Sequence, residues 1–144
     1  MSDSDAAARV RLKRRYRFTA AHFYWDASRS AAENERVFGK NANRHGHGHD
    51  YRVEVVLHGM PDASTGMLID LRELDAIVQE VVLQPLDHRN LNHEVEWFAN
   101  RQPTCENLTL FVWSALARRL PSGLLEAVSV RETDDLEAEY RGQS

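Results

Sequence analysis

The chain has 144 residues, a formal net charge of -4 and 42% hydrophobic residues, which is typical of one modest globular domain. The acidic balance gives no support to nucleic-acid binding, and no apolar run approaches the roughly 20 residues needed to cross a membrane. The single cysteine excludes an internal disulfide framework, and the N-terminus lacks the pattern of a signal peptide. We expect a cytoplasmic protein with a disordered tail over residues 1–8 and a single domain over residues 9–144.

Alternating apolar residues predict the first two strands, at about residues 9–18 and 48–58. A helix should follow from Asp70, which can cap it with Glu73 three residues later, and an apolar stripe continues to Val82. We expect Pro85 to end this helix.

The second half of the chain predicts one more helix and two more strands. Pro103 and Thr104 should open the helix, and Pro121 should stop it. Residues 128–132 read as a third strand and the residues up to Tyr140 as a fourth. The order predicts an α+β fold in which two helices cover one face of a four-stranded antiparallel sheet. Such a small sheet has two unpaired edges, so we expect subunits to associate through them.

The pattern His47-Gly48-His49 indicates a metal site. Residues two apart in a strand share a face, so both imidazoles should point the same way. His22 ends the first strand and could lie beside them in an antiparallel pair. Three histidines leave one coordination position open, which is the catalytic arrangement of zinc. The alternative is that the Asn-rich loop before His47 places these rings in water.

Two glutamates are candidates for binding a ligand. Glu132 shares an apolar strand face with Val128 and Val130, so its carboxylate needs a partner or lies at a strand end in solvent. Glu106 lies in the first turn of the second helix, where the helix dipole alone explains a negative charge. Its carboxylate could equally accept two parallel hydrogen bonds from a ligand.

Asp87 and His88 are adjacent in a segment between the two helices. A carboxylate can fix the tautomer of an imidazole for proton transfer, and both groups could face one cavity; a simple helix-connecting turn is the alternative. Cys105 reads as a small buried residue, although a thiol at a helix N-terminus can have a lowered pKa.

Seven motifs in one order resemble the 6-pyruvoyl-tetrahydropterin synthase family, which includes the 6-carboxy-tetrahydropterin synthases. The resemblance runs from about Tyr16 to Arg141. The motifs begin at Phe18 (FTAAH), Val37 (VFGK), His47 (HGHDY), Thr65 (TGMLID), Pro85 (PLDHRNLN), Pro103 (PTCEN) and Arg131 (RET).

The resemblance implies the tunnelling fold, or T-fold, in which three subunits close a twelve-stranded barrel and two rings stack as a homo-hexamer. It implies active sites at subunit interfaces and a pterin-like substrate. The metal ligands, to zinc, would be His22, His47 and His49. The substrate-binding residues would be Glu106, which anchors the pterin ring, with Thr104 and Cys105 beside it. The catalytic residues would be Asp87, His88 and Glu132.

One departure from the family pattern concerns the catalytic base. The family uses a cysteine four or six residues before the first histidine of His-Gly-His, and here these positions hold Asn43 and Asn41. An amide cannot act as a base near neutral pH. We therefore expect a homologue that binds a pterin-like substrate and lacks the standard synthase activity. The alternative is an active zinc-dependent lyase that converts 7,8-dihydroneopterin triphosphate or a related dihydropterin with another base, for which His45 is one candidate.

Overall fold

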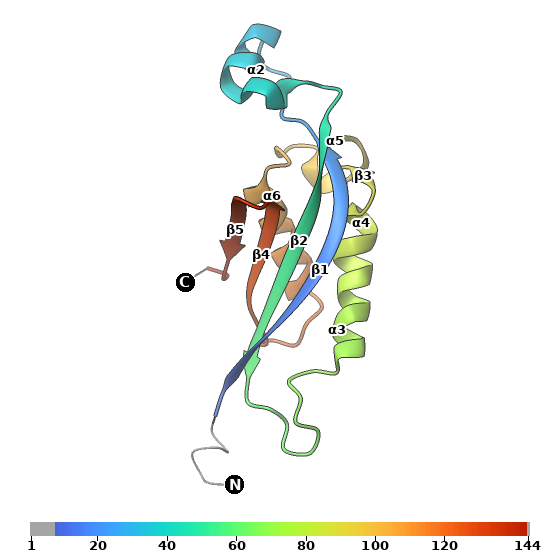
Figure 1. The fold of residues 1–144 in the computed structure, drawn as a ribbon, viewed down its shortest axis with the longest axis vertical. Helices are drawn as coiled ribbons and strands as arrows, with labels where there is room; N and C mark the ends of the chain where they lie inside the picture. Colours follow the sequence, from blue (N-terminus) through green and yellow to red (C-terminus); the bar gives the residue numbers. More distant parts are fainter. Residues whose placement is uncertain (1–7, 144) are drawn as a thin grey trace.

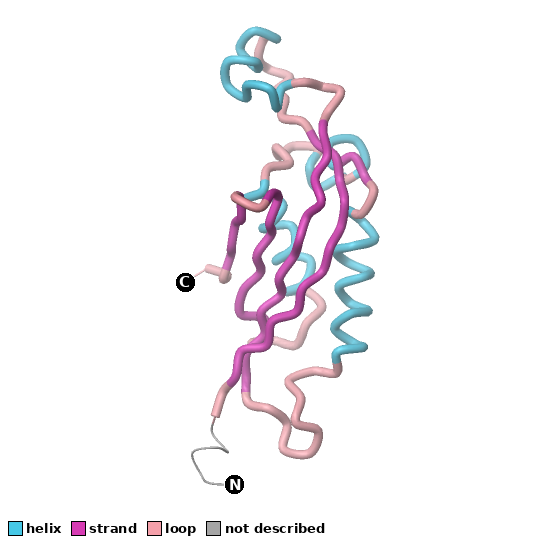
Figure 2. Tube along the Cα trace, viewed as in Figure 1, coloured by secondary structure: helices cyan, strands magenta, loops and turns pink. Residues whose placement is uncertain are grey.

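The computed structural model describes residues 8–143, which form one five-stranded sheet with helices on one face (Figures 1 and 2). The sheet order is β3-β1-β2-β4-β5. The strands are β1 (Val10–His22), β2 (His47–Gly59), β3 (Arg89–Asn90), β4 (Leu125–Thr133) and β5 (Leu136–Tyr140). The four long strands are antiparallel neighbours, as predicted, in the order β1-β2-β4-β5.

The prediction of four strands, all antiparallel, was wrong in one respect. β3 pairs with β1 in parallel through Ala20 and Ala21, so the sheet is mixed and has a fifth strand. A strand of two residues has no periodicity from which the sequence could reveal it. The tail predicted for residues 1–8 falls almost wholly outside the described residues.

The helices and single turns fill the connections between strands. The α-helices are α2 (Ala31–Phe38), α3 (Leu71–Val78), α4 (Gln84–Leu86), α5 (Leu91–Glu94) and α6 (Cys105–Ala117). Three further turns are η1 (Gly39–Ala42), η2 (Gln79–Leu83, a π-helical turn) and η3 (Glu96–Phe98). None of the described helices is long and apolar enough to cross a membrane.

The predicted helix after Asp70 is present, but Pro85 does not end it. Asp70 caps α3 by accepting a hydrogen bond from the backbone N–H of Arg72. The helical path continues through the π-turn η2 into α4, with Pro85 in the first turn of α4. A wider π-turn changes which carbonyl lies behind the proline, so the ring is accommodated without a break in the helical path.

The core lies between the sheet and the helices. α6 packs against β4 and β5, and Arg14 of β1 donates two hydrogen bonds of 2.8 Å to Asp75 of α3. The inward side chains are large and fully buried; they include Tyr51, Val53, Leu74, Leu108 and Val128. The same alternation places charged residues of β1, β2 and β4 on the opposite, solvent-exposed face.

Candidate metal centre

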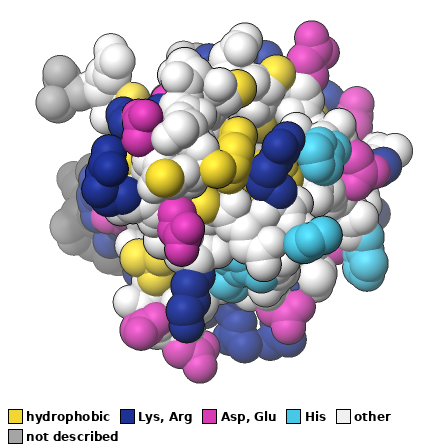
Figure 3. Space-filling view, turned by 90° about the horizontal axis from the view of Figure 1, so that it is seen from above, with side chains coloured by type: hydrophobic (Ala, Val, Ile, Leu, Met, Phe, Trp, Pro, Cys, Tyr) yellow, Lys and Arg dark blue, Asp and Glu magenta, His cyan; other side chains and the backbone are white. Residues whose placement is uncertain are grey.

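Three histidine rings meet where β1 ends and β2 begins. His22 is directly opposite His47 in the antiparallel pair, which confirms the predicted neighbour relation. His49 lies two residues further along β2 on the same face. The ring centroids are 4.7 Å apart for His22 and His47, 5.0 Å for His22 and His49, and 4.9 Å for His47 and His49. Viewed from this end of the molecule, histidine side chains gather on one side (Figure 3).

The ring nitrogens have the spacing that a metal ion requires. One ligand atom from each ring lies within 4.8 Å of the others, and the Nε2 atoms of His22 and His47 are 3.1 Å apart. Tetrahedral zinc with Zn–N bonds of 2.0–2.1 Å places its nitrogen ligands roughly 3.3 Å from each other. The buried Nε2 of His49 has no hydrogen-bond partner among the described residues. A cation bound by all three rings would satisfy it.

A backbone carbonyl orients the innermost ring. His22 Nδ1 lies 2.8 Å from the carbonyl oxygen of Pro103, the residue that leads into α6. A carbonyl can only accept, so Nδ1 carries the proton and Nε2 presents its lone pair to the other histidines. Metal-binding histidines usually have such an outer-shell partner. The proline that the sequence assigned to helix initiation therefore also positions a candidate ligand.

Desolvation favours the neutral form of all three rings, which metal binding requires, although His47 is the most exposed of them. His22 is fully buried, and this burial lowers its pKa from 6.5 to about 4 despite the Pro103 hydrogen bond. Burial also lowers the pKa values of His47 and His49. All three rings are thus unprotonated at neutral pH and compete for a cation without first losing protons.

These shifts predict that the metal-free protein is destabilised by acid. The pKa of His22 is lower in the folded protein than in the unfolded chain. The contribution of neutral His22 to the free energy of unfolding is therefore fully present above about pH 6.5 and is lost as the pH falls towards 4. A shift of this size corresponds to on the order of 3 kcal/mol. Denaturant unfolding of chelator-treated protein at pH 7 and pH 4.5 measures the loss. His45→Gln, at an exposed histidine, should keep it and His22→Gln should remove most of it; an unchanged loss in His22→Gln would contradict the assignment.

A carboxylate lies beside the histidines. Glu132 is 9% exposed and shares the buried side of β4 with Val128 and Val130, as predicted. Its Oε1 is 3.8 Å from His22 Nε2, and its Oε2 is 4.0 Å from His49 Nε2. Oε1 is buried and has no hydrogen-bond partner among the described residues. An unpaired buried carboxylate oxygen is costly, which points to a ligand or ion absent here.

The start of α6 borders this group of side chains. Thr104 caps the helix by accepting a hydrogen bond from Asn107 N–H, and Glu106 is exposed on the first turn. Burial raises the pKa of Glu132, and the nearby carboxylate of Glu106 raises it further, whereas His47 lowers it. Glu106 therefore lies within electrostatic reach of Glu132.

Cys105 is structural. Its thiol is 1% exposed and donates a hydrogen bond to the carbonyl of Val130, and burial raises its pKa to about 11. The thiol is thus protonated and turned away from solvent. A lowered pKa at the helix N-terminus was the wrong alternative, and only the backbone of Cys105 is available to a ligand.

Asp87 and His88 lie at the edge of the sheet and have no direct contact with the histidines. Asp87 accepts a 2.9 Å hydrogen bond from Thr19 N–H, and its Oδ1 lies 2.9 Å from Nδ1 of His88. His88 has a φ of 61°, which is strained for a non-glycine residue, and its side chain is 80% exposed. No hydrogen bond or ion pair within residues 8–143 joins either residue to the three histidines. Asp87 borders a hollow of about 310 Å³, and the expectation that both side chains face one cavity stays a prediction.

Sequence reasoning missed two tyrosines around the rings. Tyr24 is 5.1 Å from His22 by ring centroids, and Tyr51 is 5.6 Å from His49. Each follows a histidine by two residues. Tyr51 lies in β2, so strand alternation placed it on the face of the histidines and this signal was available, whereas Tyr24 lies beyond the end of β1 and had no such signal.

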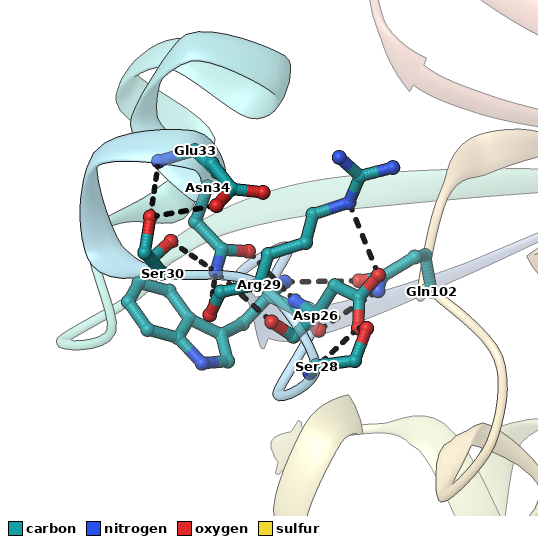
Figure 4. A network of polar contacts seen from close by, with 8 residues as sticks. Asp26, Ser28, Arg29, Ser30, Glu33, Asn34 and Gln102 are labelled. Carbon is teal, nitrogen blue, oxygen red and sulfur yellow. Dashed lines mark hydrogen bonds and ion pairs between the residues drawn. The ribbon is translucent and has the colours of Figure 1, made fainter.

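The segment that follows His22 is fixed by side-chain amides. Asn92 and Gln102 each make two hydrogen bonds to the backbone, at Phe23 and Trp25 respectively. The buried Asn34 then donates to the carbonyls of Asp26, Arg29 and Ser30, and Figure 4 shows this network. These contacts hold the chain between β1 and α2 against α5 and the segment that leads into α6.

The loop before His47 carries Asn41 and Asn43. The carbonyl of Asn41 accepts a 2.7 Å hydrogen bond from Tyr24 N–H, which ties residue 41 to the chain just beyond His22. The exposed Asn43 accepts a hydrogen bond from His45 N–H through its side chain and shapes the turn. His45 itself is exposed.

Comparisons with known proteins agree with this geometry. The family model for 6-pyruvoyl tetrahydropterin synthase matches residues 11–143. A human 6-pyruvoyl tetrahydrobiopterin synthase is 40% identical over 134 residues, which cover 93% of this chain and 92% of the human protein. A putative 6-carboxy-5,6,7,8-tetrahydropterin synthase of Archaeoglobus fulgidus is 40% identical over 96 residues, which cover 66% of this chain and 75% of the Archaeoglobus protein.

A solved structure extends the comparison to three dimensions. The Caenorhabditis elegans 6-pyruvoyl tetrahydropterin synthase superposes with a TM-score of 0.90 at 34% identity, covering 96% of this chain and 99% of that one. The family match, the human relative and this superposition each span nearly the whole sequence. The chain therefore belongs to the 6-pyruvoyl tetrahydropterin synthase family.

Proposed function

We propose that this protein binds a pterin-like substrate at a zinc ion held by His22, His47 and His49, and that it lacks the standard synthase reaction. The observation that carries the proposal is the pair of unsatisfied buried atoms, His49 Nε2 and Glu132 Oε1, at the centre of the histidine group. The lone pair of His49 Nε2 can bind a cation, and Glu132 Oε1 can accept a hydrogen bond from a ligand. Zinc suits the donor set because three neutral imidazoles leave a fourth position open.

The chain's own residues would divide the work around that ion. Glu106 anchors the amino-pyrimidine edge of the pterin, next to the cap formed by Thr104 and the backbone of Cys105. Glu132 contacts the ligand nearer the metal. Bound zinc would polarise a substrate oxygen. The loop at Asn41 and Asn43 supplies hydrogen bonds only, because neither amide ionises near neutral pH.

Replacing Glu106 by glutamine should weaken pterin binding strongly. A carboxylate matches the two adjacent N–H donors of the amino-pyrimidine, and losing a charged acceptor opposite a desolvated donor costs roughly 2–5 kcal/mol. Calorimetric titration of zinc-loaded protein with 7,8-dihydroneopterin measures the change. Glu96→Gln, an exposed glutamate in the short turn η3, is the matched control and should bind as the wild type does. Equal affinities of Glu106→Gln and wild type would place the pterin elsewhere.

Assembly should be hexameric, with residues 9–144 acting as one T-fold domain. Only Ala20 and Ala21 of β1 pair with β3, so most of that edge is open, and β5 forms the other edge of the sheet. Three copies that join the β1 edge to the β5 edge would close a barrel of twelve long strands, four from each copy (β1, β2, β4 and β5). A second subunit could then bring its Asp87 and His88 to each metal site, which accounts for their distance from the histidines of their own chain.

Sedimentation at micromolar concentration tests this assembly. Six chains of 16.5 kDa give 6 × 16.5 = 99 kDa. A mass of one chain would contradict the barrel and the shared active site together.

A second candidate function is an active zinc-dependent lyase that uses another base. Glu132 favours this function for two reasons. Burial raises the pKa of its carboxyl, and its Oε1 lies 3.8 Å from Nε2 of His22, a candidate metal ligand. Raised carboxyl pKa values suit proton transfer near neutral pH. His45 is a weaker candidate base, since its ring is exposed and only its backbone has a partner in the loop. The cytoplasmic location expected from the sequence stays a prediction.

A further inference from the structure

Three arginines stand side by side on the solvent face of the sheet. Arg17 of β1 is directly opposite Arg52 of β2, and Arg52 is directly opposite Arg131 of β4. All three side chains are exposed. Residues directly opposite on one face have Cβ atoms about 4.5–5.5 Å apart, and like charges in such pairs destabilise a sheet. The arginine row, Arg17-Arg52-Arg131, thus carries a repulsion that an added anion would relieve.

The row lies on the other side of the sheet from the metal centre. Arg17 is five residues from His22, Arg52 is three from His49, and Arg131 is adjacent to Glu132. Each of these separations is odd, so the arginines point away from the face of the histidines. The row therefore does not face the metal centre of its own chain.

The carboxylates near the row already have partners. Glu54 binds Arg15 at 2.9 Å, and Glu137 binds Arg131 at 3.2 Å. At one end of the row, Asp50 and Asp87 each accept a hydrogen bond from Thr19, and both border the hollow that Arg17 and Arg52 line.

Arg17 and Arg52 have no ion pair with any residue that the structure describes. Of the three members of the row, only Arg131 has a carboxylate partner among the described residues. That partner is Glu137 of β5, and both side chains of this ion pair are exposed. Two adjacent guanidinium groups are therefore available to an anion.

The surface around Arg52 is hollowed on both sides. One hollow of about 370 Å³ includes Arg52 and Arg131, and another of about 310 Å³ includes Arg17 and Arg52. Neighbouring strands are 4.7–4.9 Å apart, so the three arginines span roughly 10 Å. A single phosphate is shorter than this span, whereas a chain of two or three phosphates matches it.

We propose that the arginine row binds a linear polyphosphate group, either free or as the ester of a small molecule. Guanidinium forks donate paired hydrogen bonds to phosphate oxygens, so the unpaired forks of Arg17 and Arg52 fit successive phosphates and Arg131, already paired with Glu137, extends the row. In a closed barrel this face would line the central passage, so each ring would carry three such rows.

Calorimetric titration of the intact, metal-free protein with inorganic tripolyphosphate at low ionic strength tests the proposal. Removing the metal prevents the anion from binding through it. We expect wild type to bind, and Arg52→Ala, at the centre of the row, to bind roughly tenfold more weakly or worse. Arg17→Ala should weaken binding as well. Arg11→Ala is the matched control, on the same strand and face six residues away and already paired with Glu126, and should bind as wild type does.

Two further arms identify what the row recognises. Inorganic monophosphate should bind more weakly than tripolyphosphate, since it reaches fewer arginines. A nucleoside triphosphate that binds as tripolyphosphate does would show that the phosphate chain alone is read, and tighter binding would show that an esterified group adds contacts. Either result supports the proposal if Arg52→Ala weakens the binding of the nucleoside triphosphate.

Other results would overturn the proposal. Absence of tripolyphosphate binding by wild type excludes the site. Equal weakening by Arg52→Ala and Arg11→Ala would mean that only net charge matters. Loss of assembled mass in Arg52→Ala, with no anion binding by wild type, would mean that carboxylates of a neighbouring subunit satisfy the arginines instead. Arg52→Lys keeps the positive charge at this exposed position, so this variant should fold as wild type does. Weaker tripolyphosphate binding by Arg52→Lys would therefore come from loss of the guanidinium fork and not from misfolding.

Discussion

Asn41→Cys should raise the rate of 6-pyruvoyl-tetrahydropterin formation from 7,8-dihydroneopterin triphosphate by roughly 10²–10⁴-fold over wild type. This is the usual contribution of a general base, and a thiolate can take a proton that an amide cannot. Asn41 is the better of the two loop positions because its backbone is hydrogen-bonded to Tyr24, two residues beyond His22. Initial rates, with products separated by chromatography, measure the gain.

Asn43→Cys is the matched control for this gain. Asn43 is exposed and its side chain shapes the turn by accepting from His45 N–H, so a thiol there should give a smaller increase. A wild-type rate comparable with ordinary members of the family would contradict the missing-base argument. His45→Gln would then be the first variant to make.

His47→Ala should abolish stoichiometric zinc binding. Wild type should hold one ion per chain, and losing one of three ligands should weaken binding by more than the roughly 10–100-fold typical for loss of an outer-shell partner. Competition with a chromogenic chelator measures the affinity. His45→Ala, two residues away and exposed, is the control and should retain the ion. Far less than one ion per wild-type chain, or no effect of His47→Ala, would show that the histidines do not form a metal site.

The sequence predicted the parts of the fold that have a strong period. Alternation located the four long strands, and the capping residues Asp70 and Thr104 marked the starts of α3 and α6. It failed where local pattern is weak. The helix α2 (Ala31–Phe38) is short and polar, with Asn34 as its buried residue, and β3 (Arg89–Asn90) has two residues.

The site was predictable where one strand pair builds it. His22 and His47 could be matched because an antiparallel pair brings the end of one strand beside the start of the next. The Pro103 carbonyl could not be foreseen, since it reaches His22 across 81 positions of sequence. The position of Asp87 and His88 was also hidden, because a dipeptide motif does not reveal which edge of a sheet it meets.

Recovery of the bound ligand tests the central claim most directly. Zinc-loaded wild type is incubated with 7,8-dihydroneopterin triphosphate, the complex is isolated, and the bound and free pterins are identified by mass spectrometry. We predict that substrate is bound and recovered unchanged. Accumulation of a converted pterin, lost on Glu132→Gln, would contradict the claim in favour of an active lyase, and an empty pocket would contradict pterin binding itself.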